Sequence, residues 1–91
     1  DWLVSELKNK YMLGVMVASP VLLQYPQALG AIADFAYNLG TARYRSSTLK
    51  RRIDAEQWAA AKLELHKWVY GGGKKLPGLV RRRQAEAVYL P

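Results

Sequence analysis

The chain has 91 residues, 51% of them apolar, and its 14 Lys and Arg against 7 Asp and Glu give a net charge of +7. This length predicts one domain, and the apolar content excludes a disordered tail. The absence of cysteine excludes disulfides and thiolate-ligated zinc, and a single histidine, His66, argues against a Ser-His-Asp triad. We therefore expect no metal and no cofactor.

The basic charge favours an anionic partner, which could be nucleic acid, a membrane surface or an anionic polysaccharide. No membrane span is expected, because Pro20 interrupts the most apolar stretch, which falls short of the roughly 20 residues that a span needs. No signal peptide is recognisable. The sequence starts with Asp1 and not with Met, which suggests a shortened or processed chain.

The first half of the chain predicts two helices. Residues 1–18 have apolar residues at helical spacing and stop before Pro20. "PVLLQYP" then reads as a short extended connection. Residues 26–39 carry a clear apolar stripe, begin with a proline and end before Gly40, which is well placed as a C-terminal cap.

The second half predicts a loop and three further helices. "TARYR" reads as a loop, and Ser46 or Ser47 can cap a short helix that runs through Ile53. The next helix is expected to open at Asp54 or Ala55 and to end at the three glycines 71–73. A last helix runs from Pro77 to about Tyr89. Because no segment alternates with period two, we expect an all-α chain of about five helices.

The basic stretch "GGGKKLPGLVRRRQAE" covers residues 71–86. Arg83 shares a helix face with apolar neighbours, whereas Arg81 and Arg82 point roughly 100° to 200° away from it. This fan predicts a solvated helix with one arginine whose stem is buried. It does not form one ridge along a duplex, and no aromatic residues interleave with it, so nucleic-acid binding is not expected.

The carboxylates do not suggest an active site. None lies in an apolar run that would raise its pKa for general-acid work. Asp54 and Glu56 resemble helix-start residues, and Glu64 and Glu86 resemble surface partners of basic residues one turn away. Asp34 is the one carboxylate that shares a face with a candidate polar pair.

That polar pair is Tyr37 and Asn38, just before Gly40. An aromatic ring beside an amide at a helix end suits contact with a sugar or a base. The alternative is that Tyr37 packs in the core and Asn38 helps to cap the helix.

Several motifs in one order resemble a known family. They are "DFAYNLGT", "SSTLKRRIDA", two tryptophans ten positions apart, "GGGKKLPGLVRRRQAE" and the terminal "YLP". Together they resemble the C-terminal portion of phage endolysins of the T4-lysozyme-like family, glycoside hydrolase family 24. The resemblance covers residues 20–91, and residues 1–18 fit the connector helix between the two lobes of that fold.

The resemblance implies the helical C-terminal lobe of a lysozyme-like fold that is α+β when complete. Such enzymes cut the peptidoglycan glycan between N-acetylmuramic acid and N-acetylglucosamine. It implies that Tyr37, Asn38, Thr41 and Arg43 line the sugar-binding cleft. It also implies that an arginine of the last helix approaches the catalytic glutamate; Arg82 is the best candidate by position, with Arg81 or Arg83 as alternatives. The protein would be made in the host cytoplasm and act on the cell wall in the periplasm.

The sequence departs from the family at its catalytic segment. The family pattern of a Glu, eight residues, Asp or Cys, five residues and a Thr has no counterpart, since Val15 stands nine positions after Glu6. We therefore expect no catalytic residue in this chain, no hydrolysis by the chain alone, and an N-terminal catalytic lobe as a partner. The alternatives are a non-catalytic module that binds peptidoglycan or another anionic polymer, and a small nucleic-acid-binding domain. Apolar surface left open where a lobe would pack predicts self-association.

Overall fold

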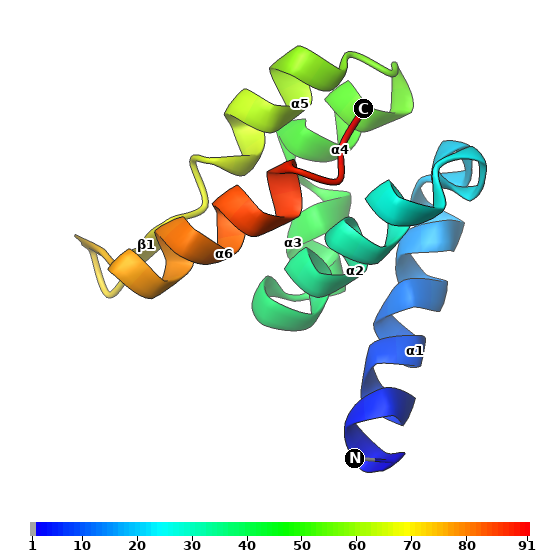
Figure 1. Cartoon of the computed structure of the whole chain (residues 1–91), viewed down its shortest axis with the longest axis horizontal. Helices are drawn as coiled ribbons and strands as arrows, with labels where there is room; N and C mark the ends of the chain where they lie inside the picture. The colour runs from blue at the N-terminus through cyan, green and yellow to red at the C-terminus, as the bar shows by residue number, and fades with distance from the viewer. Residues whose placement is uncertain (1) are drawn as a thin grey trace.

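The computed structural model describes residues 2–91, and side chains from Asn9 onward (Figure 1). The described chain is mostly helical, as predicted, with one small hairpin that the sequence did not indicate. Its elements in order are α1 Trp2–Ala18, the 3-10 helix η1 Pro20–Gln24, α2 Pro26–Leu39, α3 Thr41–Arg45, α4 Thr48–Asp54, α5 Trp58–Leu65, β1 Tyr70–Gly71, β2 Lys74–Lys75 and α6 Pro77–Ala87. Within this described part, no helix combines the length and the apolar character that crossing a bilayer requires.

Helix α2 is the centre of the fold and lies between α1 and α6 (Figure 1). Pro26 starts it, where a missing N–H costs nothing. Gly40 ends it with φ of 101°, a value that L residues rarely adopt. The predicted stripe is buried, with Ile32 and Phe35 fully inaccessible to solvent. The bounds and the buried face of this helix are both as predicted.

Phe35 and Tyr44 join distant segments of the core. The Phe35 ring makes edge-on contacts with Tyr44 and with Trp68, at centroid distances of 6.2 and 5.5 Å. The Tyr44 hydroxyl shares a buried hydrogen bond of 2.7 Å with Ser19, just after α1. Burial raises the pKa of the Tyr44 phenol well above its usual value. The core therefore ties α1, α2 and α3 together through one aromatic cluster.

Two segments predicted as irregular are helical. "PVLLQ" forms η1, because Leu22 is fully buried and a helical turn places it there. "TARYR" forms α3, because the turn after Gly40 carries Tyr44 inward against Phe35. Tertiary burial decides both segments, and local propensity does not.

The boundary between α4 and α5 lies later than predicted. Ser47 caps α4 as expected, and its Oγ accepts a hydrogen bond of 3.1 Å from the Lys50 amide. Asp54 then ends α4 and does not open the next helix. Glu56 follows with a positive φ of 56°, which breaks the helical path, and its carboxylate accepts a 2.6 Å hydrogen bond from the Tyr25 hydroxyl. Helix α5 begins only at Trp58.

The glycine run forms a hairpin instead of ending α5. Helix α5 ends at Leu65, and a tighter turn then carries Trp68 onto Phe35. Strands β1 and β2 pair antiparallel around Gly72 and Gly73, whose φ values are 59° and 79°. A two-residue hairpin with two positive φ angles is the turn that glycines favour. With strands this short, no period-two pattern exists in the sequence to reveal them.

Candidate functional site

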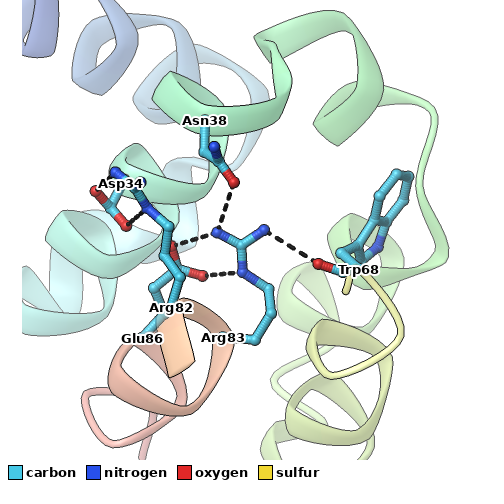
Figure 2. A network of polar contacts seen from close by, with 6 residues as sticks. All are labelled: Asp34, Asn38, Trp68, Arg82, Arg83 and Glu86. Carbon is cyan, nitrogen blue, oxygen red and sulfur yellow. Dashed lines mark hydrogen bonds and ion pairs between the residues drawn. The ribbon is translucent and has the colours of Figure 1, made fainter. Parts of the chain in front are cut away.

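A network of charged side chains joins α2 to α6 (Figure 2). Asp34 and Asn38 are one turn apart on α2, so they point the same way. Arg82, Arg83 and Glu86 come from α6, whose first residue Pro77 fixes where the helix starts. The arginines point in different directions, as predicted: Arg82 is partly exposed and Arg81 is exposed. The prediction that only the stem of Arg83 is buried is wrong, because its guanidinium is buried as well.

Arg82 makes a bidentate contact with Asp34. Its Nε donates to Asp34 Oδ2 and its Nη2 to Asp34 Oδ1, both at 3.2 Å. The two side chains are 39% and 31% exposed. Bidentate contact fixes the plane of the guanidinium while solvent still reaches it. Arg82 is therefore a cation held in place at the surface of the α2–α6 interface.

Arg83 is fully buried, and each side of its guanidinium has a partner. Its Nε lies 2.7 Å from Glu86 Oε1 and its Nη2 donates to Glu86 Oε2 at 2.8 Å. Nη2 also donates to Asn38 Oδ1 at 3.1 Å and Nη1 to the Trp68 carbonyl at 3.4 Å (Figure 2). The Phe35 ring lies 5.1 Å from the guanidinium carbon. Arg83 therefore anchors α6 to α2 and to the segment after α5.

The prediction for the position of Glu86 is wrong. The sequence predicts it at the surface, but it is 3% exposed. Burial, followed by a hydrogen bond with Asp34, raises its pKa to about 8, because the contacts with Arg83 only partly oppose them. The available signal is its spacing: Glu86 lies three positions after Arg83, so it shares the face on which that arginine is predicted to be buried.

The pKa of Asp34 is shifted in the opposite direction, below its ordinary value. Burial alone would raise its pKa, but hydrogen bonds from Glu86 and Arg82 and the charges of Arg82 and Arg83 outweigh burial and lower it. Asp34 thus carries the negative charge, and Glu86 holds a proton more readily. The expectation that no carboxylate in the chain has a raised pKa is wrong for Glu86, because its environment comes from another helix.

The four residues expected to line a sugar cleft do not all point to one place. Asn38 faces α6 and bonds Arg83. The Tyr37 ring contacts Tyr11 of α1 edge-on, at a centroid distance of 5.6 Å. Thr41 also lies against α1, because a Cβ at Gly14 would stand 3.1 Å from its Cγ2. Arg43 is exposed on α3. The end of α2 therefore presents one polar face toward α6 and another toward α1.

An open groove runs beside the charged network between α2 and α6. Its volume is about 300 Å³. Three small residues, both carboxylates of the network, a glutamine and a tyrosine line it: Gly30, Ala31, Ala85, Asp34, Glu86, Gln27 and Tyr89. Gly30 has no atom within 4 Å of where its Cβ would stand, so α2 leaves room there. Among the residues described, no three His, Cys, Asp or Glu side chains gather in a way that could hold a metal ion.

Comparison with known proteins gives consistent matches. The family model described as phage lysozyme matches residues 2–86. The chain is 42% identical over 57 residues to the SAR-endolysin of Bacteriophage PS119, a match that covers 63% of this chain and 34% of that protein. It is 34% identical over 61 residues to the SAR-endolysin of Escherichia phage Mu, covering 67% of this chain and 36% of that protein.

A match to the endolysin of Bacillus phage B103 is 43% identical over 56 residues and covers 62% of this chain and 21% of that protein. The chain thus spans about a third or less of the length of these relatives.

Proposed function

Because the chain belongs to the phage lysozyme family, we propose that it forms the helical wall of an endolysin that hydrolyses the glycan of peptidoglycan. The bond cut would lie between N-acetylmuramic acid and N-acetylglucosamine. The protein would be made in the host cytoplasm and would act on the cell wall in the periplasm. The observation that carries the proposal is the Asp34–Arg82 pair, a fixed and accessible cation beside Asn38 at the end of α2.

In this proposal Tyr37, Asn38, Thr41 and Arg43 line the glycan-binding surface, with Asn38 on its α6 side and Tyr37 and Thr41 on its α1 side. The amide of Asn38 and the ring of Tyr37 supply a polar group and an apolar face, the combination that sugars require. Arg43 adds an exposed cation on α3. Arg82 is the arginine that approaches a catalytic glutamate. Arg83 is buried against Glu86 and Arg81 lies on the outer face of α6, which makes both less suitable for that role.

The carboxylates of this chain do not make a catalytic pair. A glycosidase needs two carboxyl groups about 5 Å or more apart, one on each side of the bond that breaks. Asp34 is held by Arg82 through both carboxylate oxygens, so it does not stand free on one side of a bond. Glu86 has the raised pKa of a general acid, but its carboxylate is buried against Arg83. The acid would therefore come from an N-terminal lobe.

The groove between α2 and α6 is the surface on which such a lobe would dock. Its lining includes Gly30, Ala31 and Ala85, and also Asp34, whose carboxylate accepts a hydrogen bond from Arg82. A segment seated there would bring its own carboxylate close to Arg82, whose charge would stabilise the ionised form.

The test is clearing of outer-membrane-permeabilised Gram-negative cells by the purified chain, alone and mixed with an N-terminal lobe of a full-length relative. We expect clearing only with the lobe. Clearing by the chain alone would show that a catalytic pair exists among its own carboxylates. No clearing with either sample, while the chain stays folded by circular dichroism, would favour a non-catalytic binding module.

Glycan binding is tested separately with purified peptidoglycan strands. Arg43→Gln should weaken binding, whereas Arg45→Gln, at another exposed arginine on the same short helix, should not. Tyr37→Ala should also weaken binding. Equal affinity of all three variants and the unchanged chain would place the glycan elsewhere.

A further inference from the structure

The β1–β2 hairpin projects from one side of the molecule, well away from both ends of the chain (Figure 1). Residues 72–78 are all exposed, and the turn consists of Gly72 and Gly73, which carry no side chains. Nothing in the proposed glycan surface uses this hairpin. Because it projects, the hairpin would be the first part of this side of the molecule to contact a flat surface.

The hairpin carries positive charge that no ion pair among the described residues neutralises. Lys74, Lys75 and Arg81 are exposed, and none of them makes an ion pair with any residue in the described part of the chain. Lys67 differs, because its Nζ lies 2.7 Å from Glu64 Oε2 and its charge is therefore partly neutralised. The local charge near the hairpin is thus carried mainly by three residues.

Lys75 and Arg81 border two open hollows, which share Lys75 and Val80. One is about 360 Å³ and is lined by His66, Lys67, Val69, Tyr70, Lys75 and Val80. The other is about 380 Å³ and is lined by Lys75, Pro77, Val80 and Arg81. Within the described residues, no carboxylate lines either hollow. The surface is therefore complementary to negatively charged groups.

Apolar groups stand among these cations. Tyr70 is 63% exposed and lies directly opposite Lys75 in the hairpin, so their side chains share one face. Leu76 is 40% exposed and leans over Gly71, where a Cβ would stand 2.7 Å from its Cδ1. An exposed tyrosine and leucine flanked by lysines suit the boundary of a bilayer, where aromatic rings sit among headgroups and lysine stems extend toward phosphates.

We propose that this hairpin surface docks on an anionic phospholipid bilayer. Lys75 and Arg81, which line one hollow, and Lys74, on the opposite face of the hairpin, contact lipid phosphates when the hairpin meets the bilayer tip first. Tyr70 and Leu76 reach into the headgroup layer. A nucleic acid fits less well, because a single tyrosine cannot stack successive bases. A soluble phosphate polymer would use the cations but would gain nothing from Leu76. The proposal does not depend on glycan hydrolysis, since it involves none of the glycan-contacting residues.

Co-sedimentation with vesicles tests the proposal on the whole 91-residue chain. Vesicles of equal parts phosphatidylglycerol and phosphatidylcholine should bind the chain, and phosphatidylcholine vesicles should bind it weakly. Each lysine near an anionic surface contributes about 1 kcal/mol, so Lys74→Gln with Lys75→Gln should weaken binding about 30-fold. Binding should fall at about 1 M salt, where screening acts over roughly 3 Å.

The matched control removes the same charge elsewhere. Arg51→Gln with Arg52→Gln takes two exposed arginines from α4, which lies away from the hairpin in Figure 1. This variant should bind within about threefold of the unchanged chain, because distant charges are screened beyond about 10 Å. Equal weakening by the two double variants would mean that only net charge matters, and the hairpin site would be wrong.

Tyr70→Ser separates a bilayer from a phosphate polymer. Removing a ring that enters the headgroup layer should weaken vesicle binding at least about fivefold. If this variant binds vesicles unchanged, and inorganic polyphosphate displaces the chain from them, the surface binds phosphate polymers and the bilayer assignment is overturned. Circular dichroism of each variant confirms that the helices are retained.

Discussion

At the scale of single residues, Arg83 and Arg82 are neighbours with different tasks. Arg83 has no exposed area, and its guanidinium is surrounded by Glu86, Asn38 and the Trp68 carbonyl. Removing one partner of a buried pair costs about 3–5 kcal/mol, because a charge is left without compensation. Arg82 keeps contact with solvent and is paired with Asp34. Arg83 therefore holds the two helices together, and Arg82 remains available to a ligand.

The raised pKa of Glu86 predicts a particular dependence of stability on pH. Its pKa is about 8 in the folded chain against an ordinary value of 4.5, so the folded state binds the proton more tightly than the unfolded state. Stability from this group is full below about pH 4.5 and is lost as pH rises toward 8. In urea unfolding, the free energy of unfolding should fall across this window by an amount on the order of a few kcal/mol.

Glu86→Gln should flatten that fall, because glutamine does not titrate. The control is Glu64→Gln, which removes a carboxylate whose partner, Lys67, is exposed at the surface, and it should keep the slope of the unchanged chain. Asp34 does not confuse the result, since its lowered pKa affects stability only in more acidic solution. The same slope in Glu86→Gln and Glu64→Gln would show that Glu86 is ionised in the folded state.

At the scale of elements, α2 determines the site because it bears Asp34 and Asn38 and contacts α1, α3 and α6.

Replacing a glycine by alanine should have opposite effects on stability at Gly40, which caps α2, and at Gly30, which lies inside it. Gly40→Ala should destabilise the chain by about 1–3 kcal/mol, because its φ of 101° is strained for alanine. Gly30→Ala should stabilise it by about 0.5–1 kcal/mol, because it lies inside the helix with free space around it. Thermal unfolding measures both, and destabilisation by Gly30→Ala would mean that α2 is more tightly packed there.

The sequence predicts those elements whose signals are local. Helix α2 has its proline, its stripe and its glycine within one segment, and α6 likewise starts at Pro77. Helix α3 is not predictable in this way, because Tyr44 is drawn inward by Ser19 and Phe35, which are distant in sequence.

The charged site is predictable only in part. The burial of Arg83 follows from the apolar neighbours on its own helix. The environment of Glu86 does not, because Asp34 and Asn38 come from another helix and close over the Arg83–Glu86 pair only in the folded chain. The spacing of Arg83 and Glu86 indicates that they meet, but it does not indicate that Glu86 is buried.

At the scale of the whole molecule, this chain spans about a third of the length of its relatives. Those proteins have further residues with which to cover surfaces that are exposed here. Leu13 and Val17 are four positions apart on α1, so they share a face, and they are 61% and 70% exposed. Leu23, just beyond α1, is 54% exposed. Adjacent exposed apolar side chains of this kind mark an interaction surface.

The last prediction is that α1 mediates self-association of this chain. Sedimentation velocity should show a mass that rises with protein concentration, because pairing two copies through α1 removes this apolar face from water. Leu13→Gln with Val17→Gln should keep the chain monomeric. Leu63→Gln, a change at an equally exposed leucine on α5, should leave the association intact. If the unchanged chain stays monomeric at high concentration, the α1 face has no affinity for itself. If Leu63→Gln disrupts association as well, the contact lies on α5.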